Sequence, residues 1–283
     1  MAGITVPVRQ RVAALVRRPV EMVDDLGGQL AFYLKAIAWT PRTLHRYKKE
    51  VVRLLGEVTF GSGALSVIGG TVGVITFMTF FTGTEVGLQG YAALNQIGTS
   101  AFTGFISAYF NTREISPLVA GLALSATVGC GFTAQLGAMR INEEVDALEV
   151  MGIPSVPFLV TTRMIAGFVA VIPLYVVGLL SSYLSTRLTA TLFYGQSTGT
   201  YDHYFRLFLP PVDILWSFAK VLIFAIVVIL THCYYGYRAS GGPAGVGIAV
   251  GRAVRTSIVM VTVVDFFLSL AIWGSTVTVR IAG

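Results

Sequence analysis

Long apolar runs with few charges dominate the pattern of hydrophobic and polar positions along the chain. Uncharged stretches long enough to cross a bilayer cover residues 63–84, 86–112, 115–139 and 164–186. Two later stretches, about 212–236 and 256–279, are equally apolar but contain Asp213, Lys220 and Asp265. A helix of about 20 apolar residues spans a hydrocarbon core, and the alternation typical of membrane β-strands is absent. The pattern therefore predicts an all-α integral membrane protein.

The number of crossings depends on residues 86–137, where only Arg113 and Glu114 separate two uncharged runs and Pro117 follows. Two full crossings would need a charged hairpin of almost no length. The sequence favours one long crossing, kinked near Pro117, whose first part approaches the membrane from outside or re-enters it. The prediction is about five transmembrane helices, at 63–83, about 98–137, 160–184, 212–236 and 256–279.

Composition and charge give this arrangement an orientation. Charged residues make up 12% of the chain, against about 25% in soluble domains. With the N-terminus inside the cell, fifteen basic residues fall in inner segments, ten of them in residues 1–53, and three fall outside: Arg187, Arg206 and Arg280. This bias predicts a cytoplasmic N-terminus and an extracytoplasmic C-terminus. The basic N-terminus is expected to touch lipid headgroups, with no nucleic acid as partner.

Before the first crossing, residues 22–38 predict a helix lying in the membrane interface. The apolar residues that recur there at helical spacing are Leu26, Leu30, Tyr33, Leu34 and Ile37. A basic connection over 41–57 follows. The chain is therefore divided into a basic cytoplasmic and interfacial-helix region, 1–60, and a transmembrane domain, 61–283.

The most acidic segment, residues 139–152 (MRINEEVDALEVMG), lies between the predicted second and third crossings on the cytoplasmic side. As one helix it places Ile141, Val145 and Leu148 on one face and spreads its acids over the others. A solvated loop helix is one interpretation. The other is a helix that docks into a groove on a separate ATPase, with apolar residues giving the fit and acids pairing with basic residues of the partner.

Three stretches of the sequence resemble a known family. NEEVDALEVMGI (142–153) is similar to the coupling-helix signature of the MlaE/YrbE family of ABC-transporter permeases for lipids. REISPLVAGLALSATVGCGFTAQLGAMR (113–140) resembles the second span of that family, and VVDFFLSLAIWG (263–274) resembles its last span. The long basic N-terminus and DALEVMG are most similar to the actinobacterial YrbE permeases associated with Mce proteins.

The resemblance implies a permease subunit in a bacterial inner membrane. It would move lipid, with import as the expected direction, between MCE-domain proteins and the membrane. A second YrbE-type permease and a cytoplasmic ABC ATPase dimer are the other implied partners. The chain is expected to be no enzyme and to need no cofactor or metal, since ATP hydrolysis belongs to the partner. The implied ATPase-coupling residues are Ile141, Glu143, Glu144, Val145, Asp146, Leu148, Glu149, Met151 and Gly152.

Two departures from the family pattern favour a heterodimer. Residues 126–130 (ATVGC) lack the basic residue that family members commonly carry there. Gln135 stands where many members have a glutamate. If the second permease keeps those charges, the pair is asymmetric.

Arg113 and Glu114 interrupt the apolar sequence at membrane depth, where ionisable side chains are costly and usually face a cavity or pathway. A structural ion pair is the alternative. The resemblance places the matching pair of the family beside its lipid cavity. The residues expected to line such a cavity at a dimer interface are Arg113, Glu114, Phe77, Phe80 and Phe81. Lys220 and Asp265 are interpreted instead as partners between helices or as interfacial side chains.

Two other classes of function stay open. An integral membrane lipid-modifying enzyme would need clustered histidines and carboxylates, and the acidic segment contains no histidine. A secondary transporter often carries an inverted repeat, and none is evident in the sequence. Purification with or without a bound ATPase separates the ABC permease from both.

Overall fold

The structure is a computed structural model that describes residues 26–60 and 70–274. These residues form helices and connecting turns, and no β-strand occurs among them. Five helical segments are long and apolar enough to cross a membrane: Thr71–Gln96, Ser100–Ile141, Val156–Phe193, Pro211–Tyr237 and Gly242–Trp273. The protein is therefore an all-α, multi-pass integral membrane protein, as the apolar runs predict.

The first crossing, α5 (Thr71–Gln96), extends further along the chain than the predicted 63–83. It continues through Glu85, whose exposed carboxylate accepts a hydrogen bond from Gln89 Nε2 at 2.9 Å. A charged residue such as Glu85 ends an apolar run in the sequence. It does not end the helix, because backbone hydrogen bonding continues past it. The predicted start falls partly on residues 61–69, which lie outside the described part of the chain.

Residues 100–141 form one continuous helical segment that is long and apolar enough to cross a membrane, as the single crossing predicted over about 98–137 requires. The crossing is built of η1 (Ser100–Phe102), α6 (Thr103–Ile106), π-helical η2 (Ser107–Ile115), α7 (Ser116–Leu124), π-helical η3 (Ser125–Gly129) and α8 (Cys130–Ile141). Pro117 has no N–H to donate, and it follows a π-helical turn whose hydrogen bonding already departs from the α pattern. A proline at this place therefore does not end the helix.

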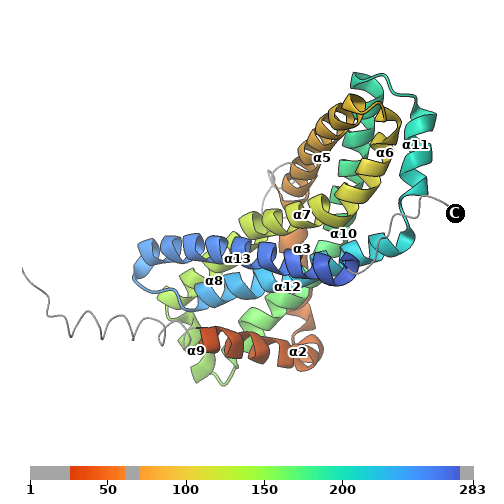
Figure 1. Ribbon diagram of the computed structural model, residues 1–283. Coiled ribbons are helices and arrows are strands. Elements are labelled where there is room, and N and C mark those ends of the chain that lie inside the picture. Colours follow the sequence, from red (N-terminus) through yellow and green to blue (C-terminus); the bar gives the residue numbers. More distant parts are fainter. Residues whose placement is uncertain (1–25, 61–69, 275–283) are drawn as a thin grey trace, which may run out of the picture.

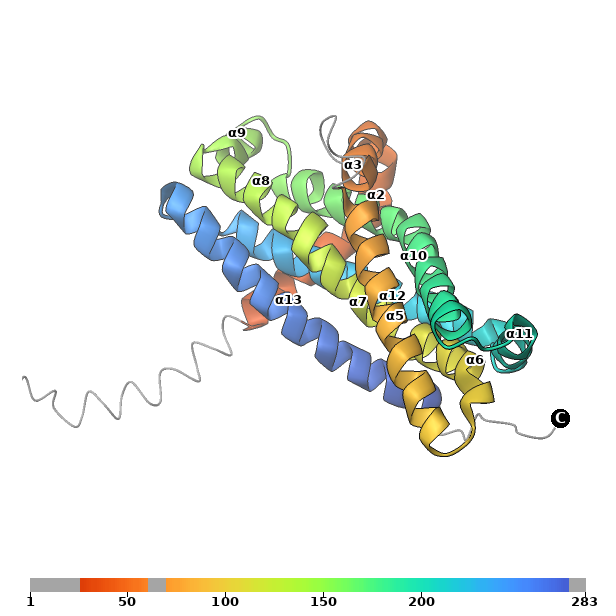
Figure 2. The ribbon, with the colours of Figure 1, turned by 90° about the horizontal axis from the view of Figure 1, so that it is seen from above.

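The third crossing joins π-helical η4 (Val156–Thr161), α10 (Thr162–Leu188) and π-helical η5 (Thr189–Phe193), and α12 (Pro211–Tyr237) and α13 (Gly242–Trp273) complete the bundle. α12 is central, because Val221, Phe224 and Ala225 have no exposed surface. α13 lies along one side of the bundle (Figure 2), and Val259, Phe266 and Phe267 are exposed on it. This long apolar face is open to lipid or to another chain.

α5 packs mainly against α10, and small residues set the distance between the two helices. A Cβ added to Gly83 would lie 2.3 Å from Ser185 Oγ and 2.5 Å from the carbonyl oxygen of Ser182. The Thr186 hydroxyl donates a hydrogen bond to the carbonyl oxygen of Gly83 at 2.7 Å. Glycine and hydroxyl residues thus let two backbones approach closely in lipid.

Three helices precede the first crossing: the N-terminal helix (26–38), α2 (Thr40–Arg46) and α3 (Lys48–Phe60). The N-terminal helix coincides with the predicted interfacial helix, except for residues 22–25, which are outside the described part. Its Tyr33 hydroxyl donates to Thr231 Oγ1 of α12 at 3.1 Å, and burial raises the pKa of Tyr33 to about 12. The same helix exposes Leu30 and Leu34, which suits a helix at a membrane surface.

Two short helices mark the two ends of the bundle (Figure 1). α9 (Glu144–Val150) follows the second crossing and lies near the turn between α12 and α13. α11 (Thr198–Leu207) follows the third crossing and lies at the other end, near the junction of α5 and α6. The acidic segment and the segment between the third and fourth crossings, which was predicted to lie outside, therefore occupy opposite ends of the bundle.

Candidate functional site

The acidic segment is a turn followed by a short helix, not the single helix predicted over 139–152. α8 ends at Ile141, and Asn142 follows as its C-cap. Glu143 adopts the left-handed backbone conformation, with φ 61°. α9 then runs for seven residues, and Gly152, with φ 72°, follows it. A left-handed residue cannot continue an α-helix, so α9 is separate from the second crossing.

α9 turns two of its apolar residues toward its own chain. Val145 has no exposed surface, and Leu148 packs against the main hydrophobic core. This differs from the predicted arrangement, in which these residues face a partner protein. The apolar surface left open at the end of α9 is formed by Val150 and Met151, which are 89% and 65% exposed.

Two of the four acids in this segment are engaged within the chain. Asp146 Oδ1 lies 2.6 Å from Arg140 Nη1, in an exposed pair that contributes little to stability. Glu149 Oε1 accepts hydrogen bonds from the Ser155 hydroxyl at 2.5 Å and from the Tyr237 hydroxyl at 3.4 Å. These contacts tie α9 to the start of the third crossing and the end of the fourth.

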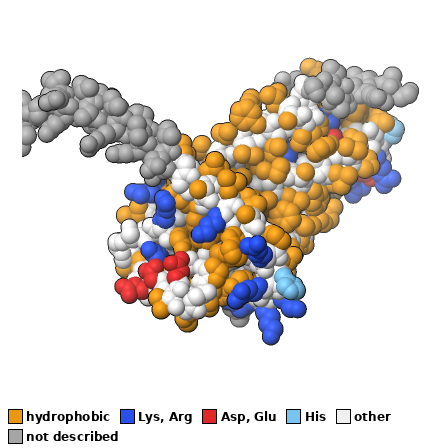
Figure 3. Space-filling model, turned by 90° about the horizontal axis from the view of Figure 1, so that it is seen from below, with side chains coloured by type: hydrophobic (Ala, Val, Ile, Leu, Met, Phe, Trp, Pro, Cys, Tyr) orange, Lys and Arg blue, Asp and Glu red, His pale blue; other side chains and the backbone are white. Residues whose placement is uncertain are grey.

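The other two acids, Glu143 and Glu144, are exposed, and within the described residues neither forms an ion pair. Figure 3 shows the face of the molecule on which acidic side chains gather at one place while basic side chains spread over the rest. A pair of exposed carboxylates at the tip of a fixed turn can meet basic side chains of another protein.

Arg113 forms a buried ion pair with Asp213, the third residue of α12. Arg113 Nη2 lies 2.7 Å from Asp213 Oδ2, and both side chains are almost enclosed. Trp273, at the end of α13, donates its indole N–H to Asp213 Oδ1 at 3.1 Å. The pair therefore joins the second, fourth and fifth crossings near the end of the bundle where α12 begins.

Lys220 forms a second group of ion pairs, about two helical turns further along α12. Its Nζ lies 2.7 Å from Asp265 Oδ1 and 3.3 Å from Glu114 Oε2. It also donates to the carbonyl oxygen of Arg113 at 2.7 Å. Lys220 has no exposed surface, and the two carboxylates offset the cost of burying its charge. The interpretation of Lys220 and Asp265 as partners between helices is confirmed.

The adjacent Arg113 and Glu114 bind different partners and differ in exposure. Arg113 is 4% exposed, and its aromatic neighbours are Tyr109, with the ring centroid 4.2 Å from the guanidinium carbon, and Trp273, at 5.2 Å. Glu114 keeps 39% of its side chain exposed. Of the two charges predicted to line a cavity, Glu114 reaches the surface and Arg113 serves as a structural ion-pair partner.

The three predicted cavity phenylalanines lie together on α5. Phe77 and Phe81 are 61% and 64% exposed and stack with their ring centroids 6.4 Å apart. Phe80 is half-buried and meets the edge of Phe81 at 5.9 Å. The cluster forms an open aromatic surface, and Arg113 has its aromatic contacts elsewhere.

Sequence reasoning missed Asp213 and Trp273 as partners of Arg113. The available signal was Asp213 itself, a carboxylate inside an apolar run, because an arginine at membrane depth requires a counter-charge. Trp273 carried no such signal, since its contact depends on how α13 crosses α12.

Comparison with known proteins identifies the family. The sequence profile described as "Permease MlaE" matches residues 60–271, which is most of the chain. A "Probable ABC transporter permease protein" of Rickettsia bellii is 27% identical over 253 residues, covering 89% of this chain and 94% of the relative. "Protein TRIGALACTOSYLDIACYLGLYCEROL 1, chloroplastic" of Arabidopsis thaliana is 28% identical over 199 residues, covering 70% of this chain and 57% of the relative. With its five apolar crossings, this chain is a membrane permease that belongs to the MlaE family.

Proposed function

We propose that this chain is the permease subunit of an ABC-type lipid transporter in a bacterial inner membrane, driven by a separate cytoplasmic ATPase dimer. α9 carries the proposal. It lies between two crossings, its inner face is tied to the bundle core, and it exposes Glu143 and Glu144 at its start and Val150 and Met151 at its end. A helix fixed in this way can pass a movement of the ATPase to both crossings. The relatives named as ABC transporter permeases support this role.

The coupling residues proposed from the sequence take different parts in this proposal. Those with exposed side chains, which would contact the ATPase, are Glu143, Glu144, Asp146, Glu149 and Met151. Those packed against the core, which would hold α9 in place, are Val145 and Leu148, and the partly buried Ile141 ends α8 just before the turn. Gly152 would allow the left-handed turn that leads into the third crossing.

Reversing both exposed acids, Glu143→Lys with Glu144→Lys, is expected to weaken ATPase binding at least tenfold, or about 1.4 kcal/mol. The reason is that two attractive contacts become repulsive. The yield of ATPase that co-purifies with the permease measures the effect. Glu57→Lys, a charge reversal on α3, is the matched control and should leave the yield unchanged. Wild-type yield from the E143K/E144K variant would show that α9 is not the docking element.

The lipid substrate is proposed from the surface of the bundle and from the name of one relative. Phe77 and Phe81 on α5, and Phe266 and Phe267 on α13, offer aromatic surface that a second permease would enclose. Glu114 is the exposed charge proposed to meet a lipid headgroup there. The Arabidopsis relative bears the name of a galactolipid.

The second permease is proposed to be a different chain, and MCE-domain proteins are proposed as the extracytoplasmic partners from which lipid is imported. Gln135 supports the asymmetry. Its neutral side-chain amide accepts a hydrogen bond from Arg163 Nη2 at 3.3 Å, where a glutamate would form an ion pair. A second permease with a glutamate at this position would carry a charge in its second crossing that this chain lacks.

The proposed orientation puts α9 in the cytoplasm and α11 outside. Single cysteines at the exposed positions Ala147 and Ser197, in a background with Cys130→Ala and Cys233→Ala, test it by labelling with a membrane-impermeant maleimide. Intact cells are expected to label S197C at once and A147C only after permeabilisation. Labelling of both positions from the same side would contradict the five-crossing topology.

A further inference from the structure

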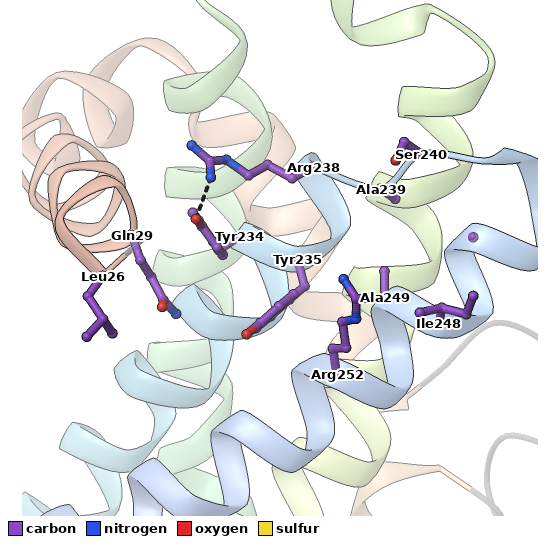
Figure 4. A pocket seen from close by; sticks show the side chains of 11 residues that line it. Leu26, Gln29, Tyr234, Tyr235, Arg238, Ala239, Ser240, Ile248, Ala249 and Arg252 are labelled. Atoms are coloured by element: carbon purple, nitrogen blue, oxygen red, sulfur yellow. Dashed lines mark hydrogen bonds between the residues drawn. The ribbon is translucent and has the colours of Figure 1, made fainter. Parts of the chain in front are cut away.

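A pocket of about 520 Å³ lies between the N-terminal helix and the turn that joins α12 to α13 (Figure 4). The N-terminal helix supplies Leu26 and Gln29, the end of α12 supplies Tyr235 and Arg238, and α13 supplies Arg252. Its volume falls within the range of about 300–1,000 Å³ that is usual for small-molecule sites. None of these five residues takes part in the proposed coupling surface or lipid cavity.

Two arginines give this pocket its charge. Arg238 donates to the Tyr234 hydroxyl at 2.5 Å, and its guanidinium carbon lies 4.7 Å from the centre of that ring. Among the residues that the structure describes, neither Arg238 nor Arg252 forms an ion pair with a carboxylate. Figure 4 shows Gln29 and Tyr235 pointing toward each other, with Arg252 reaching in from α13. Two guanidinium groups beside neutral polar groups favour a phosphate or carboxylate.

The rim of the pocket is apolar and open. Leu26 is 64% exposed, Leu30, on the next turn of the same helix, is 58% exposed, and Ile248 on α13 is 57% exposed. In a membrane protein, such side chains at the end of the bundle face acyl chains near the lipid–water boundary. The polar floor and apolar rim together match an amphiphile and not a soluble anion alone.

We propose that this pocket binds an anionic membrane lipid, whose headgroup phosphate lies between Arg238 and Arg252 and whose chains run along Leu26, Leu30 and Ile248. A zwitterionic lipid carries the same phosphate, but its ammonium group would lie beside two arginines, so the site selects for net negative charge. The bound lipid joins the N-terminal helix to the turn between α12 and α13. It belongs to the cytoplasmic leaflet if the proposed orientation holds, and its binding does not depend on transport.

Native mass spectrometry of the permease, purified with the subunits that accompany it, tests the proposal. The protein is first placed in nanodiscs of phosphatidylcholine mixed equally with phosphatidylglycerol, then released into detergent. The wild type is expected to retain one phosphatidylglycerol per chain. R238Q/R252Q is expected to retain it at least tenfold less tightly, and R252Q alone should shift in the same direction without disturbing the contact of Arg238 with Tyr234. Arg255→Gln is the matched control, because Arg255 lies one turn further along α13 and outside the pocket.

Three outcomes overturn the proposal. The first is a failure of selectivity: either the wild type retains phosphatidylcholine and phosphatidylglycerol equally, or R255Q loses as much retention as R238Q/R252Q does. The second is binding of glycerol 3-phosphate as tightly as the lipid, which would make the ligand a soluble phosphate compound. The third concerns Asp24 and Asp25, which precede Leu26 in the sequence. If only D24N/D25N retains lipid, carboxylates of the chain itself fill the site in the wild type.

Discussion

Replacement of Lys220 by methionine is expected to lower the free energy of unfolding by about 3–5 kcal/mol, because it leaves the buried carboxylate of Asp265 without its counter-charge. Lys220 has no exposed surface, and its Nζ lies within 3.3 Å of both Asp265 and Glu114. Methionine has a similar volume, so the loss would come from charge and not from a cavity. Equilibrium unfolding in mixed detergent micelles measures it.

Two further variants make this prediction specific. Lys49→Met removes an exposed lysine of α3 and should change the unfolding free energy by less than about 0.5 kcal/mol. K220M/E114Q/D265N should recover most of the loss, since a neutral group can replace a buried ion pair at little cost. A K220M variant as stable as the wild type would contradict the prediction. It would mean that Asp265 and Glu114 become protonated or find other hydrogen-bond donors at no cost in the free energy of unfolding.

Replacement of Gly83 by valine is the second change with a large expected effect, about 3 kcal/mol or more of lost stability. Its Cβ would lie 2.5 Å from the carbonyl oxygen of Ser182, a backbone atom that cannot turn aside. α5 would have to move away from α10, breaking the hydrogen bond from Thr186 to Gly83. The melting temperature of the purified protein in detergent reports the change.

Gly131→Val is the matched control for this packing argument. Gly131 is also within a membrane helix, but a Cβ there would meet no atom within 4 Å. The substitution is therefore expected to be close to neutral. Equal destabilisation by G83V and G131V would show that loss of glycine in a helix, and not the contact between α5 and α10, determines the effect.

The sequence was sufficient for the crossings because lipid demands long apolar runs, whatever the helices pack against. The five predicted spans each coincide with a long helix, although the first helix continues to Gln96, beyond its predicted end at residue 83. The exposed carboxylate of Glu85, which accepts a hydrogen bond from Gln89, interrupts the apolar pattern but leaves the backbone hydrogen bonds of the helix intact. Hydropathy cannot distinguish these two situations.

The candidate site was harder to predict, because it depends on contacts between distant segments. Periodicity grouped Val145 and Leu148 on one face of a helix but could not say that the bundle itself covers that face. The left-handed Glu143 has no common sequence signal, since glycine or asparagine is usual in that conformation. Asp213 lies 100 positions from Arg113 in the chain, so only the packing of α12 reveals the pair.

The π-helical turns of the second crossing have a consequence for how the chain tolerates changes in length. An α-helix advances about 100° per residue, whereas a π-helical turn contains an extra residue and shifts the direction of everything beyond it. η2 (Ser107–Ile115) contains Arg113 and Glu114, and it lies between α6 and α7. Losing one residue there would barely shorten the crossing but would rotate one half against the other. The register of the two ion pairs is thus fixed by residue count, so substitutions should be tolerated more readily in η2 than deletions.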